Sequence, residues 1–141
     1  MSEFDTRWDA LFLLTFVCVV SCSSVPKDNP LVGSWISDKE RTLDEIDSKP
    51  TVSARTRGLM DNDFFGKLRV TYTRDTYESE FEGEIIKGQY RIIEVNKDFI
   101  EIEEQIEGWD KRFRSKIYFD GDYMYIESNK HDFREYFKKI E

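Results

Sequence analysis

The chain has 141 residues and a formal net charge of −8, with 39% hydrophobic, 35% charged and 15% aromatic residues. This length suits one domain, or one domain with a tail, and the aromatic content argues against intrinsic disorder. The acidic balance disfavours nucleic acid as a partner, because binding phosphates requires a net basic face. Composition therefore predicts a small globular protein that does not bind nucleic acid.

The first feature in the chain is an apolar run from Ala10 to Val20, in which Thr15 is the only polar residue. The run is shorter than the roughly 20 apolar residues of a membrane-spanning helix, and its length is typical of a secretory signal peptide. It ends in Val19-Val20-Ser21-Cys22, which resembles the lipobox of bacterial lipoproteins. That resemblance implies a signal peptide over residues 1–21 and an acylated Cys22. A buried strand or helix of the domain is the alternative.

The residues on either side of this run complete the N-terminal segment. Residues 1–9 are net negative, whereas signal peptides usually begin net positive. Residues 22–30 contain two prolines and lack periodicity, which indicates an extended tether. Ser23 follows Cys22, and in Gram-negative lipoproteins the absence of Asp there implies an outer-membrane address. The resemblance therefore implies a lipid-anchored protein of the cell envelope, facing the periplasm if the source is Gram-negative.

Both cysteines of the chain, Cys18 and Cys22, lie in this segment. A mature chain that begins at an acylated Cys22 has no free thiol left. The sequence therefore predicts neither a disulfide nor cysteine-based chemistry in the domain, residues 31–141.

The domain opens with a short predicted strand at residues 31–36, and two helices are expected after it. Ser37 followed by Glu40 has the form of a capping box, and the helix that it begins is expected to end before Pro50. A second, weaker helix is expected over residues 52–61.

From Gly66 onward the hydrophobic period is two, which is the period of a strand. Asp120-Gly121 is the strongest of several turn signals and is typical of a type I′ hairpin. About eight strands result, most of them joined by tight turns, so neighbours in sequence are expected to pair antiparallel. Closure would remove the open edges of such a meander. The sequence thus predicts an all-β fold with minor α content: an eight-stranded barrel with two short helices between its first two strands.

Gly33-Ser34-Trp35, placed before this meander, resembles the Gly-x-Trp opening of the calycins, the lipocalins and intracellular fatty-acid-binding proteins. The resemblance implies a lipocalin-like barrel in which Trp35 closes one end and stacks against an arginine. Arg134 is the nearest match for that arginine, followed by Arg112 and Arg114. The two predicted helices resemble the helical lid of the fatty-acid-binding branch, and we expect them to cover the open end.

An eight-stranded barrel has an interior that side chains fill or that one small ligand occupies. The candidate lining residues are Tyr72, Phe81, Tyr90, Phe113 and Arg114. Strand period places Arg112, Arg114 and Lys116 on one face. They either reach inward to a ligand carboxylate or pair outward with acidic residues, and the outward arrangement is favoured because Phe113 and Ile117 claim the inner face.

Two predicted strands carry runs of glutamates: Glu78, Glu80, Glu82 and Glu84 on one, and Glu101, Glu103 and Glu104 on another. Strand spacing separates alternate carboxylates by about 6.6 Å, and no acidic loop accompanies them, which favours a solvated outer face over a calcium site.

The only histidine, His131, lies in a polar stretch typical of a surface loop. Without a catalytic, metal or cofactor motif, the sequence predicts no enzyme and no cofactor.

Two functions of different class are compatible with these features. In the first, a membrane-anchored lipoprotein uses its barrel to bind a small apolar or amphipathic molecule. In the second, a packed barrel without ligand contacts another envelope protein, whose identity the sequence leaves open. An apolar cavity favours the first function, and a filled interior with an exposed apolar patch favours the second.

Replacing Cys22 with serine should abolish membrane attachment, because the hydroxyl cannot form the thioether that the lipobox resemblance implies. We expect an uncleaved or soluble precursor, measured by cell fractionation and by the mass of the product. Normal processing and membrane association of Cys22→Ser would contradict the lipoprotein interpretation.

Overall fold

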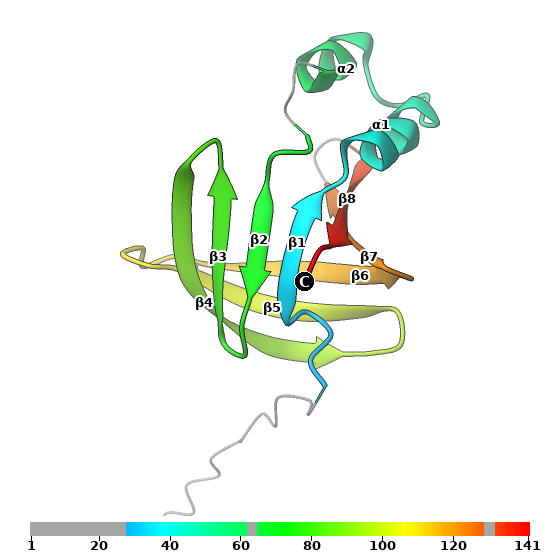
Figure 1. Cartoon of the computed structure of the whole chain (residues 1–141). Helices are drawn as coiled ribbons and strands as arrows, with labels where there is room; N and C mark the ends of the chain where they lie inside the picture. Colours follow the sequence, from blue (N-terminus) through cyan, green and yellow to red (C-terminus); the bar gives the residue numbers. More distant parts are fainter. Residues whose placement is uncertain (1–27, 62–64, 129–131) are drawn as a thin grey trace, which may run out of the picture.

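The computed structural model describes residues 28–61, 65–128 and 132–141, and its strands form one closed barrel (Figure 1). The strands are β1 (Gly33–Ser37), β2 (Arg69–Tyr72), β3 (Thr76–Phe81), β4 (Glu84–Val95), β5 (Phe99–Ile106), β6 (Arg112–Asp120), β7 (Tyr123–Ser128) and β8 (Phe133–Lys139). Each strand pairs antiparallel with its neighbours in sequence, and β1 pairs with β8. The predicted eight-stranded antiparallel barrel is confirmed.

A short seam between β1 and β8 closes the barrel. The paired residues are Trp35 with Lys139, Ile36 with Lys138 and Ser37 with Phe137. Beyond β8, the backbone N–H of Ser34 donates to the carbonyl oxygen of Glu141 over 3.2 Å. Gly33 lies beside this bond with φ of +134°, and a Cβ there would lie 2.4 Å from the Glu141 oxygen. Only glycine combines this backbone conformation with so close an approach.

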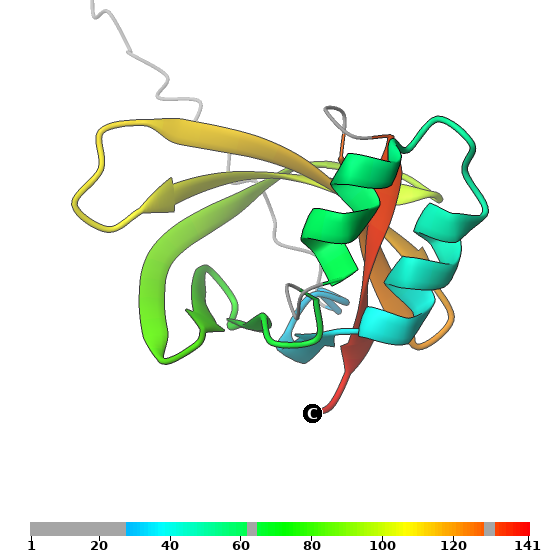
Figure 2. The same cartoon turned by 90° about the horizontal axis from the view of Figure 1, so that it is seen from above.

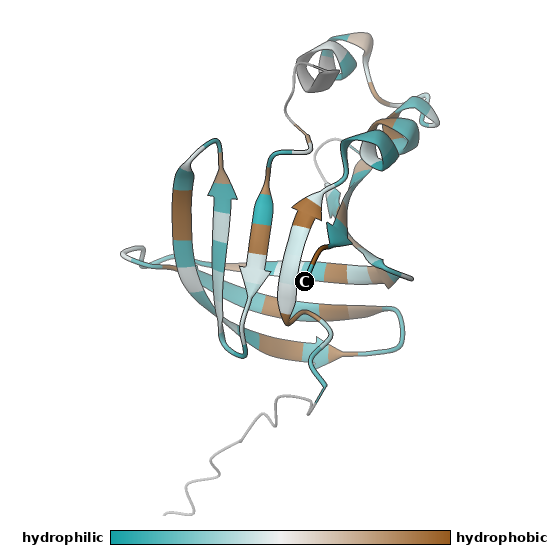
Figure 3. Ribbon diagram, viewed as in Figure 1, coloured by the Kyte–Doolittle hydropathy of each residue, from teal (hydrophilic) through white to brown (hydrophobic). Residues whose placement is uncertain are grey.

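The end of the barrel at which β1 begins, called here the closed end, is filled by apolar side chains. The cluster consists of Leu31, Trp35, Val70, Tyr72, Tyr77, Tyr90, Ile100, Ile102, Ile117, Met124 and Phe137. The ring centroid of Tyr72 lies 5.3 Å from that of Tyr90, edge to face, and 6.2 Å from that of Tyr77. Figure 3 shows the apolar bands along the strands that contribute to this packing.

Trp35 is 3% exposed within this cluster. Its indole Nε1 donates to the carbonyl oxygen of Leu31 over 2.8 Å, and the Nζ atom of Lys139 lies 5.4 Å from the ring centroid. The prediction of an arginine partner is therefore wrong. The guanidinium of Arg134 lies 4.9 Å from the centroid of Tyr125, because the β7–β8 register places both side chains on the outer face.

Asn29 binds the chain that enters β1 to the closed end. Its side-chain amide donates to the hydroxyl of Tyr90 over 2.8 Å and accepts the backbone N–H of Leu31 over 3.1 Å. The Tyr90 hydroxyl donates in turn to the carbonyl oxygen of Thr73 over 2.7 Å. The last residues of the predicted tether are thus fixed to the barrel rather than extended.

Two helices, α1 (Lys39–Asp47) and α2 (Ala54–Asp61), connect β1 to β2. The N-cap of α1 is Asp38, whose carboxylate accepts the backbone N–H of Arg41 over 2.9 Å. The predicted cap at Ser37 is wrong, because Ser37 is the last residue of β1 and its hydroxyl donates to Glu135. Within the described ranges, no helix has the length and apolar character needed to cross a membrane.

Helix α1 packs against β8. The backbone N–H of Tyr136 donates to the hydroxyl of Thr42 over 3.0 Å, and that of Asp38 donates to the Tyr136 carbonyl oxygen over 2.8 Å. A second apolar cluster lies at this contact and consists of Ile46, Val52, Phe65 and Phe133. Figure 2 shows both helices on the β8 side, away from β3 and β4. The helices therefore cover one side of the barrel end at which β1 finishes, and they leave the other side of that end uncovered.

The turn between β6 and β7 differs from the predicted type. Asp120 pairs with Tyr123, so the loop consists of Gly121 and Asp122. Of these two, only Gly121 has a positive φ, of 60°. A type I′ turn requires positive φ at both central residues, so the hairpin is confirmed and its predicted turn type is wrong.

Replacing Trp35 with alanine should lower the free energy of unfolding by about 3–5 kcal/mol, because it leaves a cavity in the closed end. Trp109→Ala is the control, since Trp109 is 55% exposed in the β5–β6 turn. We expect that variant to change the free energy by less than about 0.5 kcal/mol. Urea unfolding measures both, and equal midpoints would contradict the structural role of Trp35.

Candidate functional site

The barrel interior is more accessible at the end beside the helices, called here the open end. Side chains alternate between the two faces of a strand. Every second residue along a strand, starting from a buried residue of the closed end, therefore faces the interior. Near the open end these interior residues are Ser79, Phe81, Ile86, Glu104, Ile106, Phe113 and Ser115. All are half-buried or exposed, and Ile86 is 47% exposed. One half of the interior is thus packed, and the other half is accessible along β3 to β6.

Apolar side chains border the open end. The ring centroid of Trp109, in the β5–β6 turn, lies 6.3 Å from that of the interior residue Phe113. Ile86 and Ile106 face the same region from β4 and β5. Accessible aromatic and aliphatic groups of this kind suit the apolar part of a small ligand.

Glu104 projects into the interior from β5. It follows Ile100 and Ile102 at the strand period, and its carboxylate accepts a hydrogen bond of 3.1 Å from the hydroxyl of Ser115 on β6. Burial raises the pKa of the Glu104 carboxyl, and the Ser115 hydrogen bond opposes that rise. The sequence prediction of a solvated outer position is wrong for Glu104, although the spacing Ile100–Ile102–Glu104–Ile106 contained the signal.

Tyr72 lies in the same part of the interior as this carboxylate, because its ring packs on Tyr90, the register partner of Glu104. The residue is 4% exposed, and within the described ranges its hydroxyl has no hydrogen-bond partner, whereas Tyr90 has two. Burial raises the pKa of the Tyr72 hydroxyl, and the charge of Glu104 raises it further. The same two causes, in the same order, raise the pKa of Tyr77. Two tyrosines and one glutamate therefore meet inside the barrel.

The ring of Tyr77 depends on Gly88, which faces it across β3 and β4. A Cβ on Gly88 would lie 2.6 Å from Cε1 of Tyr77 and 2.4 Å from the Gln105 carbonyl oxygen. A side chain at this position would displace the ring or open the β4–β5 pairing, so Gly88 keeps Tyr77 against the sheet.

A second interior carboxylate, Glu135, projects from β8. It accepts a hydrogen bond of 3.0 Å from the hydroxyl of Ser37, which also accepts the backbone N–H of Gly66. Burial raises the pKa of Glu135, and the Ser37 hydrogen bond opposes that rise. The barrel interior thus holds two half-buried carboxylates, each bound by a serine.

The basic side chains of β6 point outward. Arg112 and Arg114, together with Arg91, surround Glu103 at nitrogen–oxygen distances of 3.1, 3.5 and 2.8 Å, respectively. The hydrogen bond from Arg91 is the main cause that holds the pKa of Glu103 below its usual value. Lys116 lies over the ring of Phe99, 4.5 Å from its centroid. The outward arrangement is confirmed, and Arg114 is wrong as a lining residue.

The other candidate residues fall into three places. Tyr72 and Tyr90 belong to the packed cluster of the closed end, where Gly33 and Trp35 also lie. Phe81 and Phe113 face the open end. Cys22 and His131 lie outside the described residues.

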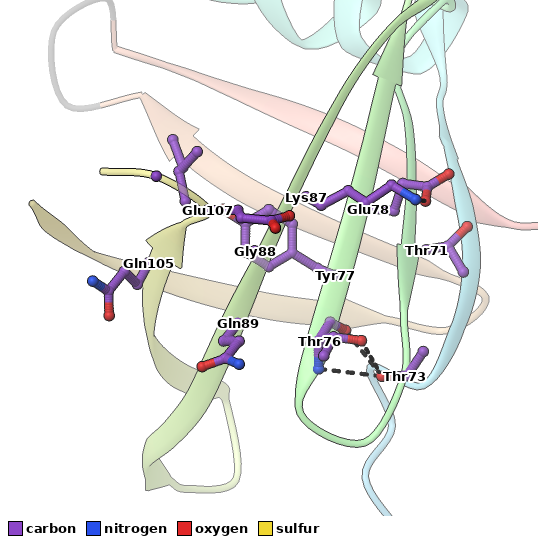
Figure 4. Close-up of a pocket in the computed structure, with 12 residues that line it drawn as sticks. Thr71, Thr73, Thr76, Tyr77, Glu78, Lys87, Gly88, Gln89, Gln105 and Glu107 are labelled. Carbon is purple, nitrogen blue, oxygen red and sulfur yellow. Dashed lines mark hydrogen bonds and ion pairs between the residues drawn. The ribbon is translucent and has the colours of Figure 1, made fainter. Parts of the chain in front are cut away.

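A cleft of about 680 Å³, called here the outer cleft, lies across β2 to β5 (Figure 4). Its polar lining residues are Thr71, Thr73, Thr76, Glu78, Lys87, Gln89, Gln105 and Glu107. Lys87 and Glu78 form an ion pair of 2.9 Å, and Thr73 and Thr76 share a hydrogen bond. Sequence reasoning missed this cleft, because its lining comes from outward-facing residues that are polar on any strand. Tyr77, Gly88 and Ile106 also line it, so the cleft offers both hydrogen-bonding groups and apolar surface to a ligand.

Within the described parts of the chain, no group of three or more histidine, cysteine, aspartate or glutamate side chains is placed to hold a metal ion. The serine–carboxylate pairs Ser115–Glu104 and Ser37–Glu135 contain no imidazole or amine base. Among the described residues, these pairs offer hydrogen-bonding groups to a ligand.

Replacing Glu104 with glutamine should stabilise the protein at neutral pH and have less effect as the pH falls. Burial raises the folded pKa of Glu104 above its unfolded value, so stability is lost as the pH rises from the unfolded pKa through the folded one. Below both values the carboxyl is protonated in either state, and the difference disappears. Thermal melts between about pH 4 and 8 measure this. Glu101→Gln, on the outer face of β5, controls for the lost charge, and a Glu104→Gln effect that is the same at every pH would contradict the burial.

In comparisons with known proteins, no family model, no curated protein and no solved structure matches the chain.

Proposed function

We propose that this chain is a lipoprotein anchored to the membrane through Cys22, whose barrel binds a small apolar or amphipathic molecule at the open end. The observation that carries the proposal is the contrast between the two ends of one interior. Packed aromatic side chains fill the closed end. Interior side chains at the open end are accessible and combine apolar groups with a carboxylate and two hydroxyls.

This combination suits a ligand with two parts. Apolar surface from Ile86, Ile106 and Phe113 can hold a hydrocarbon portion, while Glu104 and Ser115 can bind a polar group. A rigid, packed base beneath the site keeps these groups in place without the ligand, which limits the entropy lost on binding. The closed barrel and the buried Trp35 are compatible with a calycin-like fold, and membership of that group is part of the proposal.

The membrane anchor is supported by the apolar run that ends in Val19-Val20-Ser21-Cys22. Acylation of the thiol and of the new amino group would supply three acyl chains, more than the two signals that stable attachment requires. In this proposal the chain lies in the cell envelope and uses the lipid as its membrane partner.

A structural or interaction lipoprotein is the second candidate. Aromatic rings form a row across the outer face of β5 to β7, made up of Phe99, Tyr118 and Tyr125, and this row meets the buried Tyr136 of β8. The rings of Tyr118 and Tyr125 are stacked, with centroids 5.0 Å apart and planes 5° apart. Such a row, with Arg134 and Lys116 over its rings, offers a surface to another envelope protein.

Two neighbouring isoleucines on β4 test ligand binding inside the barrel. Ile86 faces the interior and Ile85 the outer surface, and they are 47% and 54% exposed. Ile86→Trp should fill the open end and exclude the ligand, whereas Ile85→Trp should leave binding intact. Native mass spectrometry of the protein purified from its host should detect a bound small molecule in the wild type and in Ile85→Trp.

Two other results of the mass measurement would contradict ligand binding at the open end. A bound mass that persists in Ile86→Trp would place the ligand elsewhere, for example in the outer cleft. If no variant carries a bound mass, and protein pull-downs recover one partner that requires Tyr125, the interaction candidate is favoured.

A further inference from the structure

Acidic rather than basic side chains face the barrel interior beside the open end. Glu104 and Glu135 face the interior, while Arg91, Arg112 and Arg114 face outward around Glu103. This is the reverse of a site for a carboxylate ligand, in which a basic group faces inward.

No described basic side chain forms an ion pair with Glu104. Its hydrogen bond comes from the neutral hydroxyl of Ser115, over 3.1 Å. The nearest register neighbours, Tyr90 and Phe113, are uncharged. Lys139 lies against Trp35 at the closed end, and Lys111 lies against the ring of Phe113 in the β5–β6 turn. An unpaired, half-buried carboxylate is costly to a fold, and its place here is explained if a bound molecule supplies the missing cation.

Tyr72 provides a second and independent sign of a ligand. Its side chain is 4% exposed, and within the described residues its hydroxyl has no hydrogen-bond partner. Among the described residues, Arg57 Nε is the one fully enclosed side-chain nitrogen or oxygen without a partner, so the Tyr72 oxygen keeps accessible surface and can accept a hydrogen bond from a ligand. The ring of Tyr72 packs on that of Tyr90, with centroids 5.3 Å apart, and Tyr90 is the register partner of Glu104, so the unpaired oxygen and the unpaired charge lie in the same region. The carboxylate charge of Glu104 also raises the pKa of Tyr72.

From these two features we infer that the molecule bound in the barrel carries an ammonium head group, which donates to the carboxylate of Glu104 and to the hydroxyl oxygen of Tyr72. The inference rests on the proposed function and names its ligand class: an alkyl or aryl amine rather than a fatty acid. The rings of Tyr72 and Tyr77 also attract a cation. The apolar part of the amine extends towards Ile106, Phe113 and Trp109 at the open end.

The test compares three ligands that share an alkyl tail and differ in head group: octylammonium, octanoate and 1-octanol. Isothermal titration calorimetry with the soluble Cys22→Ser protein measures their affinities. Octylammonium should bind about tenfold or more tightly than octanoate, because a charge-assisted hydrogen bond replaces a repulsion. Octanol should bind with intermediate affinity.

Glu104→Gln should weaken octylammonium binding by about tenfold or more and leave octanol binding unchanged, since it removes the charge and keeps the shape. Glu101→Gln removes one charge from the outer face of the same strand and should change neither affinity. Tyr72→Phe should weaken octylammonium binding less than Glu104→Gln does, because it removes one neutral acceptor.

The outcomes separate the head-group inference from the function on which it rests. Octanoate binding as tight as octylammonium, or octylammonium binding that survives Glu104→Gln, overturns the ammonium assignment. If octanol still binds in either case and Ile86→Trp abolishes that binding, the barrel function stands without the assignment. If none of the three ligands binds, both the inference and the proposed function are contradicted.

Discussion

The structure depends on the seam at which the sheet closes. Three residue pairs join β1 to β8, and the approach of the C-terminal carbonyl to Gly33 extends the contact. Because closure converts a meander into a barrel, it gives every strand an interior face. The packed cluster, the accessible open end and the inward position of Glu104 all exist only because this seam forms. A glycine with a positive φ is thus as important to the site as the residues that line it.

The interior is filled unevenly, and the two halves have different energetic roles. Aromatic and aliphatic packing at the closed end, centred on Trp35 and Tyr72, stabilises the fold. At the open end, burial raises the pKa values of Glu104 and Glu135, so their ionised forms oppose folding. A protein selected only for stability would place apolar residues at these positions. The packed half allows the other half to keep groups that suit binding.

Strand period and turn residues were sufficient to predict the number of strands, their antiparallel order and the closed barrel. They failed at Glu104: the period set by Ile100, Ile102 and Ile106 pointed it inward, but the polar run of which it is part favoured an outer face. The register against β4 and β6 gives the correct assignment. A helix was predicted in the region of α1, but the strand against which it packs could not be predicted. That packing is determined by contacts such as the one between Thr42 and Tyr136, which are distant in sequence. Arg134 was assigned to Trp35 by resemblance, and the β8 register places Lys139 there instead.

The attachment of Asn29 to Tyr90 places the start of the described chain at the closed end of the barrel. In the proposed lipoprotein, the six residues that follow Cys22 up to Asp28 would span at most about 20 Å, so the closed end would face the membrane and the open end would point into the water beyond it. Lipids of the same membrane then have no direct path into the barrel. Cargo would arrive from the aqueous side, brought by free diffusion or by a soluble donor that docks end-on. The protein would act as a stationary receptor at the surface rather than as an extractor of bilayer components.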